Sequence, residues 1–196
     1  MPTLALVGEG KGEVSALPTL ASRVLHAEGV SDWHVRRDII RIPRGQLVDE
    51  SQPSPHRPPA RRGFDQAIGV ALAGRAQALV VLVDADDDCP RAFGPPALPL
   101  FKNRIRGSAV MAVREFETWL VLSHTPQQLE RAGIRNAEAK RDAKKLLEKL
   151  VPGYLPTTHQ LELTKKINVT ALRSVSNSFD KFARDVVAAT GPRASR

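Results

Sequence analysis

An apolar run that ends abruptly in aspartates, LVVLVDADDDCP over residues 79–90, constrains the fold of this chain more than any other stretch. The segment Val80–Val83 is aliphatic enough for a strand buried on both faces, and such strands lie in the middle of parallel sheets. The aspartates then fall at the carboxyl end of that strand, where open α/β sheets place their ligands. Because neighbouring carboxylates repel one another by about 1 kcal/mol per pair even in water, this junction predicts a bound cation.

Strand and helix patterns alternate on both sides of this run. Apolar stretches predict further strands at 3–7, 33–42 and 108–113. Helical spacing of apolar residues predicts helices at 13–28 and 61–77. Proline-rich segments at 43–59 and 90–99 predict loops, the second of which leads through a short helix into the last strand. The alternation predicts an α/β fold with a mainly parallel sheet flanked by helices.

Beyond Trp119 the pattern is helical. Helices are predicted at 127–131, 136–150, 161–172 and 177–189. A chain of 196 residues can bury a proper core. We therefore expect one domain, with its core over 1–122, a helical C-terminal extension over 123–190 and a flexible tail over 191–196.

A second acidic segment, the turn Glu9-Gly10-Lys11-Gly12-Glu13, follows the first predicted strand. The turn lacks the glycine and hydroxyl positions of a phosphate-binding P-loop, and it lacks the third glycine of a dinucleotide fingerprint. Two interpretations remain. Glu13 is either an ordinary glutamate at the start of a helix, where the helix dipole favours it, or one of two metal-binding carboxylates four residues apart.

The other acidic segments also have ordinary alternatives. The run Asp84–Asp88 lacks the glycine and glutamate of a calcium-binding EF-hand loop, and no upstream P-loop makes it a Walker-B strand. A solvated acidic turn remains as its alternative. Glu115 and Glu117, after the last strand, share one side if the chain there is extended, and they diverge if a helix has already begun.

All three segments stand at the carboxyl ends of predicted parallel strands, which meet at one edge of such a sheet. Oxygen ligands without histidine or cysteine favour Mg²⁺ or Mn²⁺ over zinc. The histidines lie apart, with no ligand spacing. The sequence thus predicts a site for one or two of these ions, with the candidate ligands Glu9, Glu13, Asp84, Asp86, Asp88, Glu115 and Glu117.

The chain is strongly basic, with a net charge of +8, which favours an anionic partner, and nucleic acid is the leading candidate. Aromatic residues are too few for an evident single-strand stacking platform, so duplex DNA is the preferred substrate. The arginines expected to hold its backbone are Arg36, Arg37, Arg41, Arg44, Arg57, Arg61 and Arg62. With no long apolar run, no leader and a single cysteine, Cys89, we expect a cytoplasmic protein that does not enter a membrane.

The order of these motifs resembles the Toprim domain, most closely the version in the overcoming-lysogenization-defect (OLD) family of nucleases. The resemblance rests on the glutamate-glycine turn, on a strand that ends in Asp-x-Asp (Asp84, Asp86) and on the acidic pair Glu115 and Glu117. The segments ALVGEGKGEVSALP, LVVLVDADDDCP and VREFETW are also similar to an uncharacterised bacterial family of small, free-standing Toprim-like proteins, often encoded beside ABC-type or AAA-type ATPases. The similarity covers residues 3–120 and continues more weakly through 154–182.

The resemblance implies a metal-dependent site that cleaves phosphodiester bonds. It implies the following roles: Glu9 as metal ligand or general base, Glu13 as ligand at a second site, Asp84 and Asp86 as central ligands, and Glu115 and Glu117 as closing acids. It also implies a lysine near the scissile phosphate, for which Lys165 or its neighbour Lys166 is the candidate. A role in ATPase-linked defence against phage follows from the same resemblance.

Two functions of other classes stay open. In the first, the protein is a non-catalytic or regulated Toprim-like subunit that docks on a partner ATPase through the helical region from residue 127 onward. In the second, it carries out phosphoryl chemistry on RNA or a small nucleotide. The sequence does not predict the oligomeric state.

Overall fold

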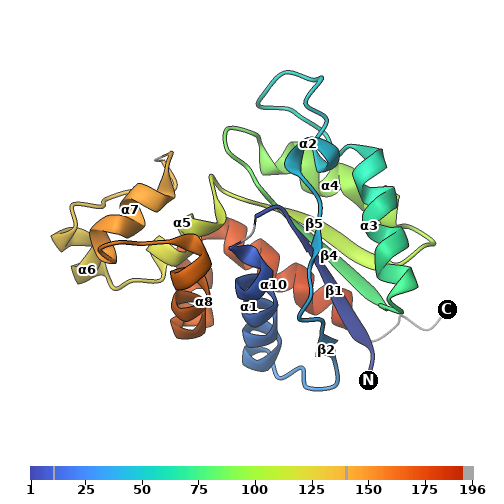
Figure 1. The fold of residues 1–196 in the computed structure, drawn as a ribbon, viewed down its shortest axis with the longest axis horizontal. Coiled ribbons are helices and arrows are strands. Elements are labelled where there is room, and N and C mark those ends of the chain that lie inside the picture. Colours follow the sequence, from blue (N-terminus) through green and yellow to red (C-terminus); the bar gives the residue numbers. More distant parts are fainter. Residues whose placement is uncertain (11, 140, 192–196) are drawn as a thin grey trace.

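The computed structural model describes residues 1–10, 12–139 and 141–191, and its strands form one parallel sheet. The strands are β1 (Thr3–Gly8), β2 (His34–Val35), β3 (Ile40–Arg41), β4 (Ala78–Asp84) and β5 (Arg106–Ala112). Their order is β2-β1-β4-β5, and β3 pairs with the carboxyl end of β1 (Figure 1). The predicted α/β class, with a mainly parallel sheet flanked by helices, is confirmed.

Helices connect the strands and make up the C-terminal region. Those before β5 are α1 (Glu13–Ala27), α2 (Arg44–Leu47), α3 (Arg61–Ala73) and α4 (Pro90–Phe101). Those after β5 are α5 (Phe116–Leu122), α6 (Pro126–Arg131), α7 (Ala143–Leu150), α8 (Pro156–Lys166), α9 (Val169–Val175) and α10 (Asn177–Thr190). Among the described residues, no helix combines the length and the apolar character that crossing a membrane requires.

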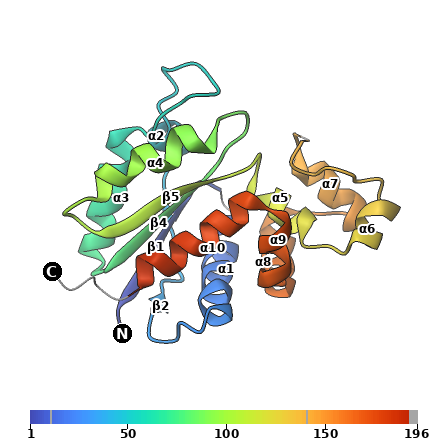
Figure 2. The ribbon, with the colours of Figure 1, turned by 180° about the vertical axis from the view of Figure 1, so that it is seen from behind.

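The sheet has a hydrophobic core on each face, because successive side chains of a strand point to opposite sides. Leu4 and Leu6 of β1 face a core shared with α1 and α10, whereas Ala5 and Val7 face a core shared with α3 and α4. The buried residues of β4 and β5 alternate in the same way. The result is three layers, with α1 and α10 on one face of the sheet and α3 and α4 on the other (Figures 1 and 2).

The segment after β4 is helical, so the proline-rich loop predicted there is wrong. Helix α4 contains three internal prolines, Pro95, Pro96 and Pro99. Each of them removes a backbone hydrogen bond from the helix. Phe93 and Phe101 of α4 are nonetheless buried against Phe64 of α3, with ring centroids 5.9 and 5.6 Å from it. Burial of this apolar face offsets the missing hydrogen bonds.

The strand predicted over 33–42 is interrupted. Only His34–Val35 and Ile40–Arg41 pair with β1, at its two ends. Between them the chain bends at residues 37–38, and Arg36 forms an ion pair with Asp38. Arg36 and Asp38 pair with each other and Arg37 is exposed, and the strand is divided at these charged residues.

Two predicted C-terminal helices are shorter or divided. Helix α7 begins at Ala143 rather than at residue 136, because the side chain of Asp142 caps it by accepting a hydrogen bond from the Lys145 N–H. The helix predicted over 161–172 is two helices, and the Asn168 side chain caps the second of them. Residues 192–196, most of the predicted tail, lie outside the described residues, as do Lys11 and Lys140.

The C-terminal helices and the sheet share one core. Phe179 and Phe182 of α10 pack against Trp119 of α5, with ring centroids 5.3 Å from it in both pairs. The Trp119 indole N–H donates to Ser178 Oγ (2.9 Å). This packing fixes α5 at the end of β5, close to the acidic residues that the sequence singles out.

Candidate metal centre

Three neighbouring strands end at one edge of the sheet, and an acidic residue stands at or just beyond the end of each. Glu9 follows β1, Asp84 is the last residue of β4, and Glu117 lies in the first turn of α5, after β5. Glu115, just before α5, is extended, with φ −142° and ψ 159°. The chain is therefore extended at Glu115 and helical at Glu117. The sequence leaves open whether this acidic pair is extended or already helical, and the structure shows one residue in each conformation.

Backbone N–H groups tie these side chains to the neighbouring elements. Glu9 Oε1 accepts a hydrogen bond from the Asp84 N–H (2.7 Å), and Asp84 Oδ1 accepts one from the Phe116 N–H (2.7 Å). Glu13, the first residue of α1, accepts from the Glu9 N–H through Oε2 (3.1 Å). One oxygen of each of these three carboxylates therefore accepts a hydrogen bond from a backbone N–H. This bond orients the other oxygen.

Glycines in the opening turn make room for the side chains of the site. A β-carbon on Gly8 would lie 2.6 Å from Glu13 Oε2. A β-carbon on Gly12 would overlap the side-chain amide of Gln160. Glycine at these two positions lets Glu13 and Gln160 approach the main chain closely.

Gln160, on α8, holds Glu117 in place. Its Nε2 donates to Glu117 Oε1 (2.9 Å), and the two side chains are buried, with residue exposures of 3% each. Sequence reasoning missed Gln160. It lies in a helix that follows β5 by many residues, and no local pattern distinguishes it from other polar residues of that helix.

The acidic side chains are close enough to raise one another's pKa. Burial, and then the charge of Glu13, raise the pKa of Glu9 to about 7. Burial, and then the charges of Glu13, Glu9 and Glu117, hold the pKa of Asp84 well above its usual value. Burial and the charge of Glu117 also raise the pKa values of Glu13 and Glu115. We call Glu9, Glu13, Asp84, Glu115 and Glu117 the acid cluster.

The lysine that the structure brings to the acid cluster is Lys144 of α7. Its Nζ lies 3.8 Å from Glu117 Oε1. Burial alone would lower the pKa of Lys144, but the charges of Glu117, Glu115 and Asp84 outweigh it and raise that pKa. Lys165, the lysine predicted to be catalytic, lies on α8 with its side chain 52% exposed and paired with Glu162 (2.7 Å). The position of Lys144 depends on the packing of α7 against α5, which the local sequence does not reveal.

The chemistry of the acid cluster suits a divalent cation. It consists of hard oxygen donors, which Mg²⁺ and Mn²⁺ prefer. Glu115 Oε2 is buried without a hydrogen-bond partner in the described part of the chain. Among the described residues, no group of three or more acidic, histidine or cysteine side chains is already arranged to hold a metal ion. The residue types fit the ion, as does the negative charge, which Lys144 offsets only in part. The side chains of the site would have to turn toward the ion.

The rest of the aspartate run turns away from the acid cluster toward arginines. Asp86 has a left-handed backbone, with φ 50°, and its side chain lies 3.4 Å from Arg44. Asp88, whose side chain is 1% exposed, contacts Arg44 and lies 3.8 Å from Arg57. The charge of Asp86 still contributes to the raised pKa of Glu9. Of the candidate ligands, Asp86 and Asp88 are thus the two that the structure does not bring together with the others.

A cavity of about 590 Å³, which we call the arginine cleft, lies beside this turn and reaches Glu115 of the acid cluster. Three basic residues, Arg57, Arg114 and Arg141, line it together with five acidic ones, Asp86, Asp87, Asp88, Glu115 and Asp142. Asp87 pairs with Arg114 (2.6 Å) and contacts Arg141. The cleft therefore carries arginines that acidic side chains hold in position next to the candidate metal centre.

The other arginines predicted to hold phosphates lie in several places. Three of them are engaged with acidic side chains: Arg36 with Asp38, Arg44 with Asp88 and Arg61 with Asp65. Arg41 and Arg62 are exposed. Arg57 lines the arginine cleft, and Arg37 lines a different groove, along α1.

Comparisons of this chain with protein-family models, with curated proteins and with solved structures found no match in any of the three.

Proposed function

We propose that this protein is a metal-dependent nuclease that hydrolyses phosphodiester bonds in nucleic acid, with DNA as the expected substrate. The observation that carries the proposal is the acid cluster itself, in which mutually repelling carboxylates gather at the carboxyl edge of a parallel sheet. This edge is where open α/β sheets bind ligands. A buried group of like charges needs a cation to balance it.

The side chains of the acid cluster would hold Mg²⁺ or Mn²⁺, one or two ions. When bound, such an ion polarises a phosphoryl oxygen and lowers the pKa of water. Glu9 Oε2 is the oxygen that the Asp84 N–H leaves free, which makes it the candidate acceptor of a proton from water. Lys144 Nζ, beside Glu117, offers positive charge to phosphate oxygens.

The arginine cleft supports a phosphate-bearing substrate. It adjoins Glu115, and its guanidinium groups would make bidentate contacts with phosphate oxygens if the phosphate displaced Asp87 and Asp88 from them. The net charge of +8 adds long-range attraction for nucleic acid. We therefore propose that the backbone of the substrate crosses the arginine cleft to reach the acid cluster.

Cleavage of supercoiled plasmid in the presence of Mn²⁺ tests this function. Glu9→Gln and Asp84→Asn should each lower the cleavage rate by about 10²-fold or more, because each replaces a carboxylate that would bind the metal ion with a neutral amide. The matched control is Glu130→Gln, which changes an exposed glutamate on α6 and should cut like the parent protein. Equal cutting by all four proteins would overturn the assignment of the site.

The cellular setting is proposed from the sequence and the family resemblance. The single cysteine, Cys89, suits a reducing compartment, so we propose a cytoplasmic protein. The resemblance to Toprim-like proteins encoded beside ATPases makes an ABC-type or AAA-type ATPase the expected partner and phage defence the expected role. Co-purification of the protein with the product of a neighbouring ATPase gene tests this partnership, and a protein that runs alone with and without that product contradicts it.

A further inference from the structure

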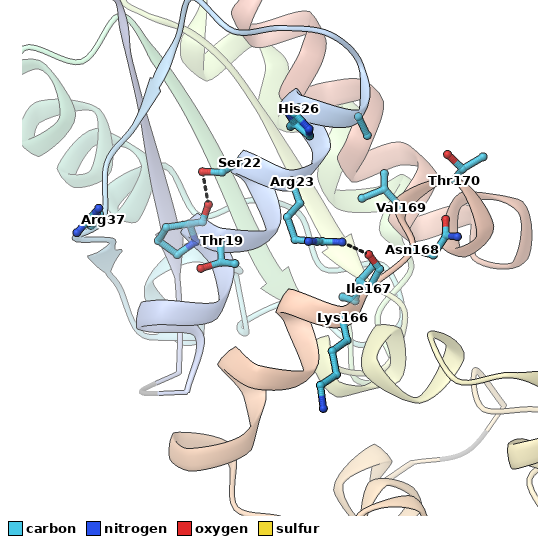
Figure 3. Close-up of a pocket in the computed structure, with 12 residues that line it drawn as sticks. Thr19, Ser22, Arg23, His26, Arg37, Lys166, Ile167, Asn168, Val169 and Thr170 are labelled. Atoms are coloured by element: carbon cyan, nitrogen blue, oxygen red, sulfur yellow. Dashed lines mark hydrogen bonds between the residues drawn. The ribbon is translucent and has the colours of Figure 1, made fainter.

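A groove of about 780 Å³ lies along helix α1 (Figure 3), and we call it the α1 groove. Residues of α1 form its floor, and the segment where α8 ends and α9 begins forms one wall. Four basic residues line it, Arg23, His26, Arg37 and Lys166, and no acidic residue does so in the part of the chain that the structure describes. Its size is that of a ligand site, and its lining favours an anion.

The α1 groove carries positive charge that acidic side chains of the described residues balance only in part, through the longer-range interaction of Glu162 with Lys166. No carboxylate of residues 1–10, 12–139 and 141–191 forms an ion pair with Arg23, Arg37 or Lys166. This distinguishes the groove from the arginine cleft, where Asp87 and Asp88 engage the guanidinium groups. Cations gathered without ion-pair partners repel one another, so an anionic ligand would be stabilising there.

Arg23 occupies the centre of the groove and is anchored. It extends from α1 and donates from Nη2 to the main-chain carbonyl of Ile167, as Figure 3 shows. A guanidinium has five N–H donors, so this bond leaves others for phosphate oxygens. Asn168, on the wall, accepts from the Ala171 N–H through Oδ1, which leaves its amide N–H groups as further donors.

The α1 groove and the acid cluster are built on the same two helices. Glu13 begins α1, and Arg23 follows ten residues later, which at 1.5 Å per residue is about 15 Å along the helix. On α8, Gln160 contacts Glu117, and Lys166 at the end of the helix lines the groove. A distance of about 15 Å corresponds to roughly four nucleotides along a duplex, at 3.4 Å each.

We propose that the α1 groove binds backbone phosphates of the nucleic-acid substrate, a few nucleotides away from the bond that is cut. The proposal rests on the proposed function, because it describes how the same substrate is held. Arg37 lies on one side of α1, and Arg23 and Lys166 lie on the other (Figure 3). This spread suits successive phosphates of a strand better than the single phosphate group of a small molecule.

The test measures binding without cleavage. Fluorescence anisotropy of a labelled DNA duplex of about 20 base pairs, in EDTA and over a range of salt, gives Kd and the salt slope of binding. The variant is Arg37→Gln combined with Lys166→Gln, both exposed positions. The charge-matched control is Lys102→Gln combined with Arg131→Gln, exposed positions outside the groove. Melting followed by circular dichroism confirms that each protein is folded.

The groove variant should bind the duplex about tenfold more weakly than the parent at about 0.1 M salt, and its salt slope should be smaller by about two, one for each phosphate that the protein no longer neutralises. The control should stay within about twofold of the parent. Equal Kd values and slopes for the groove variant and the control overturn the proposal. So does a variant that binds the duplex normally but loses binding of a labelled nucleoside triphosphate, because the groove is then a small-molecule site.

Failure of the nuclease proposal has a different signature. Glu9→Gln should bind the duplex in EDTA as tightly as the parent, since its defect is in cleavage. If the parent protein does not cut with Mn²⁺ while the groove variant still loses duplex binding, the α1 groove is a nucleic-acid site and the proposed cleavage is wrong.

Discussion

Glu117 is a buried carboxylate that Gln160 holds by a hydrogen bond, with Lys144 farther away. Gln160 Nε2 donates to its Oε1, and Gln160 Oε1 has no hydrogen-bond partner among the described residues. Gln160 therefore serves the site through its N–H₂ group alone. It is a positioning residue, since it contacts a proposed ligand and not the substrate.

Gln160→Leu should weaken Mn²⁺ binding by about tenfold, because a metal ligand that loses its hydrogen-bond partner is no longer held in orientation. Isothermal titration calorimetry with Mn²⁺ measures this. Gln127→Leu, at an exposed position on α6, is the matched control and should bind Mn²⁺ like the parent. Equal affinities for the two variants would show that Gln160 does not support a metal ligand.

Glu9 makes stability depend on pH in an unusual direction for an acid. Its pKa is raised from 4.5 to about 7 in the folded protein. The folded state then binds this proton more readily than the unfolded state does. The contribution of Glu9 to stability is fully present below the ordinary pKa and is lost as the pH rises through about 7.

In EDTA, the parent protein should therefore lose unfolding free energy relative to Glu9→Gln as the pH rises from about 4 to about 8, by about 3 kcal/mol at most. Chemical denaturation of both proteins across this pH range measures the difference. A difference that is flat, or that changes in favour of the parent at high pH, contradicts the raised pKa.

The turn between β4 and α4 is the element that divides the aspartate run into two parts. Asp86 and Arg114 both have left-handed backbones, with φ 50° and 65°. The Asp86 N–H donates to the Arg114 carbonyl (2.8 Å), and Arg114 Nη1 donates to the Asp86 carbonyl (2.9 Å). These two bonds join the ends of β4 and β5. Asp84 therefore stays within the acid cluster, whereas Asp86, Asp87 and Asp88 point toward arginines.

Within this turn, Asp88 and Asp86 should respond differently to loss of charge. Asp88→Asn leaves Arg44, whose side chain is 13% exposed, without its most buried partner, and should lower the unfolding free energy by about 3 kcal/mol. Asp86→Asn, at a side chain that is 59% exposed, should change it by less than about 1 kcal/mol. Urea denaturation measures both.

The same pair of variants tests the prediction that both residues are metal ligands. If Asp86→Asn keeps the Mn²⁺ affinity of the parent, the role of Asp86 is confined to the turn between β4 and α4. A large loss of Mn²⁺ affinity in Asp86→Asn, with stability unchanged, would restore it as a ligand.

At the scale of the whole molecule, the sequence predicts β1, β4 and β5 because their signals are local, whereas the strand predicted over 33–42 is divided. Val80–Val83 mark a buried central strand, and the alternation of strands with helices predicts the parallel order. Parallel order then brings Glu9, Asp84 and Glu117 to one edge without further information. These features follow from periodicity and need no knowledge of which helix packs where.

The features that the sequence does not predict depend on tertiary packing. Helix α4 is stable in spite of its prolines because Phe93 and Phe101 are buried, which no window of the sequence reveals. Gln160 and Lys144 reach Glu117 from separate C-terminal helices, so neither lies near an acidic motif in the sequence. Lys165 carries the same functional group as Lys144, but its side chain on α8 is 52% exposed and pairs with Glu162.

The central claim is that the acid cluster binds a catalytic divalent cation. Diffraction from crystals of the parent protein soaked in Mn²⁺, with anomalous scattering recorded, tests it most directly. We expect an anomalous peak between Glu9, Asp84 and Glu117, and its absence in Asp84→Asn crystals treated in the same way. A soaked parent crystal with no peak at the acid cluster, or with Mn²⁺ only beside Asp86 and Asp88, would contradict the account.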